Sequence, residues 1–334
     1  MKAIIYEGPE KVTVKNVPEP EVKPGEVLVQ ISYAGICGTD LNIYAGTHPR
    51  AKAPLIPGHE FSGVTMTDCS RFPKGTRVAG YPLLSCGHCD PCKTGNEHVC
   101  DTLGLLGIDC DGAMTEYIPV AEEKLVKLPD AMSDKLGAFV EPVAVTVHAL
   151  RENNFVPGAK TAVFGCGTIG LATALTLRIF GAQEVTMFET DGSRATFART
   201  MGFEVFNPIG LNMEKFAREK TDGAGFDWVF DCAGVQPVAN VLIDVVKVKG
   251  HIVIIAGYKK PAELPLIKGM FKEISIGFTR VYRYKDFDIA ANIMQREPDY
   301  EKIITNLLPL DEAKKGFDLL TTPGTGAIKV MFKI

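Results

Sequence analysis

Four cysteines lie close together in the chain and have the spacing of metal ligands. They are separated by two, two and seven residues: Cys86, Cys89, Cys92 and Cys100. Four thiolates on one short loop match a closed tetrahedral zinc site, which stabilises the loop and leaves no coordination position open for chemistry. Free thiols or disulfides are the alternative, but cysteines at this spacing fit one ion better than two bridges. We expect a structural zinc, with His88 and His98 at the surface of the loop.

A second group of candidate metal ligands is spread along the chain. Cys37 lies in the segment GICGTD, His59 and Glu60 lie in PGHEFSG, and Glu141 lies in VEPVAV. A thiolate, an imidazole and a carboxylate would supply three protein ligands, the number that leaves a catalytic zinc an open position for water or substrate. The spacing alone does not decide the matter, because an isolated cysteine is more often a core residue. Core and metal-binding interpretations both stay open at this point.

A glycine-rich segment has the pattern of a dinucleotide-binding turn. The strand-like run TAVFG leads directly into GCGTIG, which is followed by a helical pattern. In such a turn Gly165 permits the tight bend, Gly167 lets the backbone approach a pyrophosphate, and Gly170 allows close packing of helix on strand. Thr168 and Ile169 then begin the helix, whose N-terminal N–H groups and dipole favour an anion. We expect the phosphates of a dinucleotide at this turn.

Glu189 and Arg194 bear on the choice of nucleotide. Glu189 ends the next strand-like run, EVTMFE, at the distance where an acidic residue binds the ribose 2′-hydroxyl of NAD. A carboxylate at that point repels the additional phosphate of NADP. Arg194 could accommodate that phosphate, or it could stack beside the adenine. We expect NAD; the alternative is that the glycines only shape a turn and Glu189 is a solvated strand end.

The elements that must position these residues follow two patterns. Up to about residue 140 the chain has short β-type runs between Pro and Gly residues, which favours a barrel-like β domain. From about residue 145 strands and helices alternate in five successive units, which indicates a doubly wound parallel sheet. With 334 residues the chain is long enough for two domains. We expect them at 1–142 and 143–276, with residues 277–334 returning to the first.

Composition argues against several classes of function. The net charge is −4 and the isoelectric point is near 5.9, so no basic field is available to hold a phosphate backbone, and we expect no nucleic-acid partner. The sequence has no uninterrupted apolar stretch of about 18 residues and no signal-like start. We therefore expect no membrane association and a cytoplasmic location.

Five motifs together give the chain a family resemblance. GICGTD, PGHE, the four-cysteine loop, the EP dipeptide that begins at Glu141 and the glycine turn stand in the order seen in zinc-containing medium-chain alcohol dehydrogenases. The chain resembles in particular the branch of sorbitol and other polyol dehydrogenases and threonine dehydrogenase. Because the resemblance covers essentially the whole chain, it implies an α/β fold with a GroES-like β-barrel catalytic domain and a Rossmann NAD-binding domain.

The resemblance also implies roles for individual residues. Cys37 and His59 match the family's ligands of the catalytic zinc, and Glu60 and Glu141 match its acidic ligands, without a ranking between the two. Thr39 resembles the hydroxyl that takes the alcohol proton. Many relatives carry a histidine five residues after the zinc cysteine, but this chain has Asn42 there. Since an amide does not titrate near pH 7, the proton must leave through water or through His48.

The segment Arg280–Tyr284 resembles the part of sorbitol-type enzymes that contacts substrate. Arg283 and Tyr284 would favour a substrate with several hydroxyls or a carboxylate. An edge strand with exposed side chains is an equally good interpretation of the same segment.

These features together imply an NAD-dependent dehydrogenase with two zinc ions per subunit, one catalytic and one structural. The expected substrate is a polyol or a sugar-derived secondary alcohol, which would be oxidised to the ketone, and the expected assembly is a homodimer or homotetramer. L-threonine is the alternative substrate. A non-catalytic nucleotide- and metal-binding protein is the alternative from another class, and the presence of Cys37, Thr39, His59 and Glu141 together argues against it.

Overall fold

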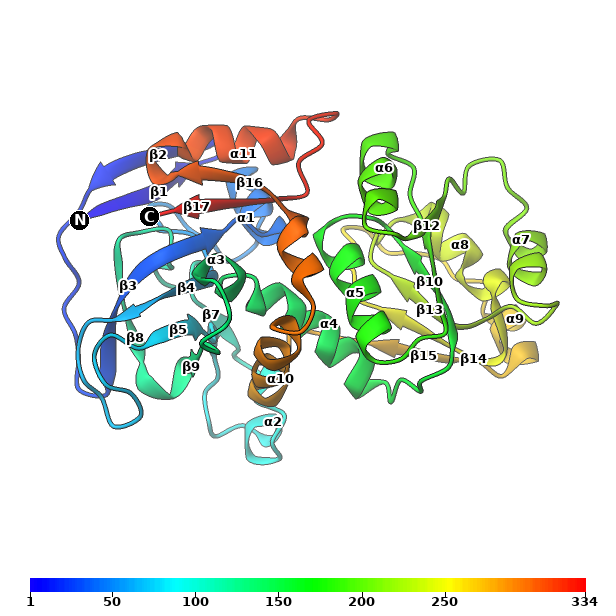
Figure 1. Cartoon of the computed structure of the whole chain (residues 1–334), viewed down its shortest axis with the longest axis horizontal. Coiled ribbons are helices and arrows are strands. Elements are labelled where there is room, and N and C mark those ends of the chain that lie inside the picture. Colours follow the sequence, from blue (N-terminus) through cyan, green and yellow to red (C-terminus); the bar gives the residue numbers. More distant parts are fainter. The chain divides into compact units, whose positions relative to one another are not determined.

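The computed structural model describes residues 1–334. Its contacts divide the chain into two compact units, Met1–Ala144 together with Arg283–Ile334, and Val145–Tyr282. Each unit has its own main sheet. In the sheet of the first unit, N-terminal strands, drawn in blue, lie beside the C-terminal strand β17, drawn in red (Figure 1). The boundaries thus follow residues 144 and 282, compared with 142 and 276 in the sequence interpretation.

The first unit is built on a seven-stranded, mainly antiparallel sheet with the order β16-β17-β3-β4-β5-β9, in which β8 also pairs with β3. Two further pairs, β1-β2 and β6-β7, form small sheets. Alternate residues of β3 are fully buried, the pattern of a strand with one face on a core. The strands are β1 (Lys2–Gly8), β2 (Lys11–Asn16), β3 (Glu26–Gly35), β4 (Glu60–Thr65), β5 (Arg77–Gly80), β6 (Leu83–Leu84), β7 (Gly104–Leu105), β8 (Tyr117–Ala121), β9 (Leu125–Lys127), β16 (Ile304–Pro309) and β17 (Lys329–Lys333).

Short helices connect these strands and cover the sheet. Helix α10 begins at Tyr284, and the carboxylate of Asp286 in its first turn accepts the backbone N–H of Arg283. Helix α11 packs on β2 and β17. The helices of this unit are α1 (Gly38–Tyr44), α2 (Asp90–Lys93), η1 (Glu97–Val99), η2 (Glu122–Lys124), α3 (Asp134–Gly137), α10 (Tyr284–Met294), η3 (Pro298–Ile303), η4 (Leu310–Glu312) and α11 (Ala313–Thr321). Helix α4 (Val140–Glu152) begins in the first unit and continues into the second.

The second unit is a six-stranded parallel sheet with the order β12-β11-β10-β13-β14-β15 and helices packed against it (Figure 1). Strands β10 and β11 are buried at four of five positions, as expected for strands covered on both faces. The strand order reverses between β10 and β13, and ligands of such sheets bind at the carboxyl ends of the strands beside this reversal. The elements are β10 (Lys160–Phe164), α5 (Thr168–Ile179), β11 (Glu184–Phe188), α6 (Gly192–Thr200), β12 (Glu204–Phe206), α7 (Met213–Lys220), β13 (Phe226–Asp231), α8 (Gln236–Val245), β14 (Val246–Ile254), α9 (Leu266–Lys272) and β15 (Ser275–Phe278).

One boundary differs from the sequence interpretation. The alternation of strands and helices from residue 145 predicts a helix over the run VANVLIDVVKVKG, but α8 ends at Val245 and β14 already begins at Val246. The first residue of β14 pairs with Phe226 of β13 across an irregularity in the register. A run of β-branched residues suits helix and strand alike, and the pairing with β13 decides the outcome here. None of the helices combines the length and apolar character that a membrane crossing requires.

Candidate active site

Sheet pairing in the first unit gathers the scattered metal-ligand candidates. Cys37 lies just after β3, His59 directly precedes β4, and Glu60 is the first residue of β4. The two strands pair so that Gly35 lies opposite Glu60. One ligand atom each from Cys37, His59 and Glu60 lies within 4.8 Å of the other two. His59 and Glu60 are each 2% exposed. This donor set of sulfur, imidazole nitrogen and carboxylate oxygen fits a zinc ion.

The buried carboxylate of Asp40 lies next to two members of this group. Asp40, in the first turn of α1, accepts the backbone N–H of Cys37 at 2.8 Å, and its other oxygen lies 3.9 Å from Nδ1 of His59. Burial raises the pKa of Asp40, while the charge of His59 opposes that rise. Burial lowers the pKa of His59, but the charges of Asp40 and Cys37 outweigh it and raise this pKa well above its ordinary value. Because Nδ1 faces Asp40, Nε2 is the nitrogen left for a metal.

Lys329, the first residue of β17, is the second residue that contacts this group. Its ammonium group forms an ion pair with Glu60 and donates to the carbonyl of Ile36 at 2.8 Å. A Cβ atom at Gly35 would lie 2.2 Å from Oε2 of Glu60 and 3.0 Å from Cε of Lys329. A side chain at Gly35 would therefore have to displace this buried pair.

Glu141, unlike Glu60, does not belong to the cluster of Cys37 and His59. It lies in the first turn of α4, is 7% exposed, and is not among the three residues whose ligand atoms cluster within 4.8 Å. Its charge nevertheless contributes to raising the pKa of His59. The geometry therefore favours Glu60 over Glu141 as the carboxylate that groups with Cys37 and His59.

The proton-pathway candidates lie on and after α1. Thr39 is half-buried in the first turn, two residues after Cys37, and Asn42 is half-buried one turn later. His48 follows the helix, and its Nδ1 accepts the backbone N–H groups of Arg50 at 3.3 Å and Ala51 at 3.2 Å. Burial and the charge of Arg50 lower the pKa of His48, so its ring is neutral at pH 7.

The four cysteines of the loop also lie together. The sulfur atoms of Cys86, Cys89, Cys92 and Cys100 all fall within 4.8 Å of one another. The backbone N–H of Cys86 donates to the sulfur of Cys100, and that of Cys89 donates to the sulfur of Cys86. His88 is exposed as expected. His98 is only 4% exposed, so the expectation that it lies at the surface was wrong. It belongs to the short helix η1, in which it is the buried residue.

The glycine turn in the second unit borders a cavity of about 520 Å³. Gly165 adopts a φ of +101°, and a Cβ at Gly170 would lie 1.9 Å from the carbonyl oxygen of Gly165, so both positions require glycine. At Gly167 an added Cβ would meet nothing within 4 Å, which leaves open space at the N-terminus of α5. Thr168 and Ile169 form the first residues of that helix. These features fit a pyrophosphate.

Glu189 and Arg194 line the same cavity. The Glu189 carboxylate accepts backbone N–H groups of Cys166 at 2.7 Å, Thr190 at 2.7 Å and Asp191 at 2.9 Å. Three backbone donors fix the position of this carboxylate at the end of β11. Sequence reasoning missed a second fixed carboxylate, Asp231, which ends β13 and accepts the hydroxyl of Tyr258 at 2.6 Å. An acidic residue at the end of a buried strand was the available signal.

Arg283 and Tyr284 have partners within the first unit. Arg283 donates to Oδ1 of Asn96 at 2.7 Å, in the loop that carries the cysteines. The hydroxyl of Tyr284 donates to the carbonyl of Leu125 at 3.2 Å and accepts from Arg71 at 3.0 Å. Arg283 caps α10 and Tyr284 begins it, so the edge-strand interpretation of this segment was wrong.

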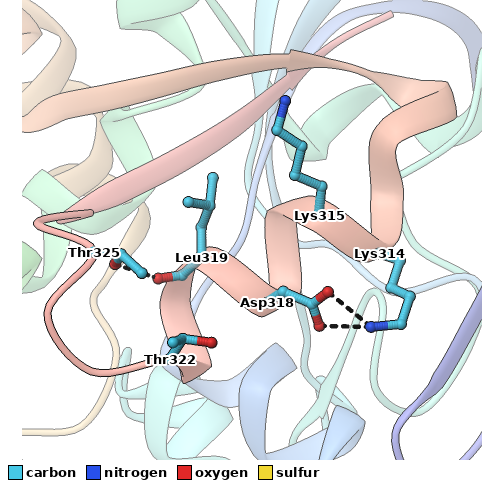
Figure 2. Close-up of a pocket in the computed structure, with 6 residues that line it drawn as sticks. All are labelled: Lys314, Lys315, Asp318, Leu319, Thr322 and Thr325. Carbon is cyan, nitrogen blue, oxygen red and sulfur yellow. Dashed lines mark hydrogen bonds and ion pairs between the residues drawn. The ribbon is translucent and has the colours of Figure 1, made fainter.

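A further hollow lies along α11 and does not have the features of a substrate site. Figure 2 shows the residues that line it, which come from α11 and the turn after it. Lys314 is paired with Asp318 four residues later at 2.7 Å, and Thr325 donates to the carbonyl of Leu319 at 2.7 Å. Lys315 binds Glu312 at 2.6 Å, so the charged groups of this hollow are engaged along the helix and do not point to a common centre.

Comparison with known proteins decides the family. Residues 23–130 match the alcohol dehydrogenase GroES-like domain, and residues 168–296 match the zinc-binding dehydrogenase domain. The 2-dehydro-3-deoxy-L-galactonate 5-dehydrogenase of Pseudoalteromonas atlantica is 33% identical over 298 residues, which cover 88% of this chain and 87% of that protein. The chain belongs to the zinc-containing medium-chain alcohol dehydrogenase family.

Solved structures of other dehydrogenases have the same fold. The 2R,3R-butanediol dehydrogenase from Bacillus subtilis superposes with a TM-score of 0.92 at 29% identity, covering 100% of this chain and 99% of that one. An alcohol dehydrogenase of Escherichia coli CFT073 in complex with NADH has a TM-score of 0.92 at 27% identity, with the same coverage. As a zinc-containing medium-chain dehydrogenase, the chain is an enzyme of alcohol oxidation or carbonyl reduction, and the predicted GroES-like and Rossmann architecture is confirmed.

Proposed function

We propose that this enzyme oxidises a polyol or a sugar-derived secondary alcohol to the ketone, with NAD⁺ as the hydride acceptor. The alcohol loses a hydride from its carbinol carbon to NAD⁺ and a proton from its hydroxyl, which gives the ketone, NADH and H⁺. The observation that carries the proposal is the clustering of one ligand atom each from Cys37, His59 and Glu60 within 4.8 Å. This set leaves an open position for a substrate oxygen.

A zinc ion held by Cys37, His59 and Glu60 would supply a Lewis acid that lowers the pKa of the alcohol hydroxyl. Asp40 lies 3.9 Å from Nδ1 of His59, so Nε2 is the nitrogen left to bind the metal. Thr39, two residues after Cys37 in the first turn of α1, would accept the alcohol proton. Glu141 acts on the site at longer range through its negative charge. The four cysteines would hold a second, structural zinc.

NAD is the cofactor that the second unit favours. The open space at Gly167 and the amides of α5 fit the pyrophosphate, and the fixed carboxylate of Glu189 fits the ribose hydroxyls. That carboxylate would repel a 2′-phosphate. Two relatives, each 27% identical, have been solved with NADH and with NADP respectively, so the choice of NAD rests on Glu189.

Relatives support the substrate class. The similar proteins act, by their names, on a sugar-acid derivative and on a vicinal diol, both of them with secondary hydroxyls.

We also propose that the chain functions in the cytoplasm, because its cysteines cluster as metal ligands rather than as disulfide partners, and that it assembles as a homodimer or homotetramer.

A substrate screen at the NADH absorbance tests the proposal. The zinc-loaded enzyme is mixed with polyols, sugar acids, 2,3-butanediol or L-threonine, with NAD⁺ and NADP⁺ side by side, and the Cys37→Ser variant is the control. We expect turnover with secondary alcohols of the polyol class and NAD⁺, and none with the variant. Turnover of L-threonine alone, preference for NADP⁺, or equal activity of the variant would each contradict the corresponding part.

A further inference from the structure

Two loops follow neighbouring strands at the carboxyl edge of the sheet in the second unit. Residues 232–235 follow β13 and residues 255–258 follow β14, and these two strands pair in parallel (Figure 1). We call them the β13 loop and the β14 loop. Ligands of a doubly wound sheet bind at this edge. Three residues of the β13 loop line the cavity beside the glycine turn: Cys232, Ala233 and Val235.

The carboxylate of Asp231 binds both loops. Its Oδ1 accepts the backbone N–H groups of Ala233 at 2.9 Å and Gly234 at 3.0 Å, and its Oδ2 accepts the hydroxyl of Tyr258 at 2.6 Å. Asp231 is 0% exposed, so no water reaches this carboxylate from the surface. Burial and the hydrogen bond to Asp231 raise the pKa of Tyr258, so the phenol keeps its proton and donates it at neutral pH. Tyr258 thus supplies the one side-chain donor to Asp231.

The two loops are also in direct contact through their backbones. The main-chain carbonyl of Asp231 accepts the N–H groups of Ile255 and Ala256, each at 3.0 Å. Gly234 has a φ of +65°, and a Cβ atom there would lie 3.0 Å from Cβ of Ala256. The conformation of the β13 loop is therefore coupled to the position of the β14 loop beside it.

The chain after the β14 loop is joined to the start of α8. The side-chain amide of Gln236 donates to the carbonyl of Glu263 and accepts its N–H, both at 2.9 Å. Tyr258 packs against the same core cluster as Val238 and Val241 of α8. Because packing already orders the ring of Tyr258, its hydrogen bond to the buried carboxylate costs little further conformational entropy.

The β13 loop contacts the glycine turn. A Cβ atom at Gly165 would lie 3.4 Å from the main-chain carbonyl of Cys232 and 3.5 Å from Cβ of Ala233. The N–H of Cys232 donates at 3.0 Å to the carbonyl of Phe164, directly before the turn. Ala233 and Val235 are exposed and line the cavity, so a dinucleotide bound there would cover them. The path of this loop thus determines the shape of the cavity next to the glycine turn.

We infer that Asp231 and Tyr258 are positioning residues for the dinucleotide, which hold the β13 loop in its binding conformation before the ligand arrives. The inference rests on the proposed NAD site. A loop that becomes ordered only on binding loses conformational entropy at that moment, and a pre-organised loop avoids this cost. Without the hydroxyl, Oδ2 of Asp231 is buried and has no donor, which costs free energy until the loops move and water reaches it. The dinucleotide then binds more weakly.

Binding of NADH to the full-length, zinc-loaded protein without substrate tests this inference. Trp228, the only tryptophan of the chain, lies on β13, and energy transfer from it to NADH reports binding. Tyr258→Phe keeps the ring and loses the hydroxyl. We expect its Kd for NADH to rise about tenfold, the lower end of the range for a lost hydrogen bond to a charged group. At saturating NAD⁺ its kcat should stay within about twofold of the parent value, since a loss of uniform binding raises KM alone.

Three further variants complete the experiment. Asp231→Asn keeps an oxygen for the two backbone N–H groups and an N–H group for the phenol oxygen, so its Kd should stay closer to the parent value than that of Tyr258→Phe. Tyr33→Phe is the matched control and should change nothing, because Tyr33 is also half-buried and its hydroxyl forms no hydrogen bond. Should Tyr258→Phe fail to fold, Gln236→Ala removes the second link between the loops and should raise the Kd about threefold.

Amide hydrogen exchange locates the effect within the molecule. In Tyr258→Phe the amides of Ala233 and Gly234 should exchange faster, while that of Cys166, which binds Glu189, should not change. An unchanged Kd together with a lower unfolding temperature would make the hydroxyl purely structural and overturn the inference, as would a fall in kcat at unchanged Kd. A parent that binds neither NADH nor NADPH would overturn the proposed dinucleotide site as well, whereas equal Kd values for the parent and Tyr258→Phe would overturn only the roles of Asp231 and Tyr258.

Discussion

Lys329 and Glu60 form an ion pair in the interior of the first unit, with both side chains 2% exposed. Lys329 also donates to the carbonyl of Ile36, directly before Cys37. The pair thus connects the last strand, β17, to both segments that carry metal-ligand candidates. Because two buried charges compensate each other here, removal of either one leaves the other without a counter-charge in a medium that solvates it poorly.

Lys329→Met should therefore destabilise the first unit by about 3 kcal/mol, since it leaves the Glu60 carboxylate buried and unpaired. The loss should be smaller with zinc bound, because the ion supplies positive charge near the same carboxylate. Thermal unfolding with and without a chelator measures both effects. Lys314→Met is the control: its pair with Asp318 is exposed and should contribute less than about 0.5 kcal/mol. Equal stability of the two variants would contradict this account of the buried pair.

The zinc content should be two ions per chain, because two separate groups of candidate ligands each lie within 4.8 Å. Cys37→Ser should retain one ion and keep its thermal stability, since the cysteine loop is untouched. Cys92→Ser should lose the other and fold poorly, because structural zinc contributes directly to folding. Metal analysis by mass spectrometry, with unfolding curves on the same samples, checks this. A Cys37→Ser protein with as much zinc as the parent would remove Cys37 from the site.

The sequence predicted the parts of the site whose residues are close in the chain. The cysteine loop and the glycine turn carry their chemistry within a few residues, so spacing alone identified them. Lys329 lies 293 residues from Ile36, and no local pattern marks a lysine in AIKVMFKI as a buried counter-charge. Asp40 was likewise overlooked, because only the tertiary structure brings its carboxylate next to His59. The predicted end of α8 was wrong for a related reason. The β-branched run across it has no local preference for helix or strand, and the pairing of β14 with β13 decides where the helix ends.

Glu189→Ser should weaken NAD⁺ binding and improve the use of NADP⁺. The substitution removes a carboxylate that accepts three backbone N–H groups, and each such charged bond is worth about 1.5–3 kcal/mol. We expect kcat/KM for NAD⁺ to fall at least about tenfold, from a looser turn as well as a lost ribose contact. Glu189→Gln separates the two causes, because it keeps an acceptor oxygen but no charge. Glu184→Ser, at the start of the same strand, should change neither value. A parent that already prefers NADP⁺ would make Arg194 the controlling residue.

The proton should leave the site through water rather than through His48. In the neutral ring only one nitrogen accepts, and Nδ1 of His48 already accepts from Arg50 and Ala51, so Nε2 carries the hydrogen. Taking up a second proton would cost both backbone bonds, and burial with the charge of Arg50 lowers the pKa of His48 further. His48→Asn keeps an acceptor for these amides without a titrating ring, so it should leave the pH profile of kcat unchanged.

Thr39 and Asn42 complete the same experiment. Thr39→Val should reduce kcat by at least about a hundredfold, in the range of a lost general acid–base group, because Thr39 carries the hydroxyl closest in sequence to Cys37. Asn42→Ala should be mild, since an amide cannot carry the proton by titrating near pH 7. A fall in the neutral-pH turnover of His48→Asn that added buffer base restores would instead make His48 the proton acceptor. If Asn42→Ala proves as harmful as Thr39→Val, the Asn42 side chain holds substrate or cofactor, and the exit through water is wrong.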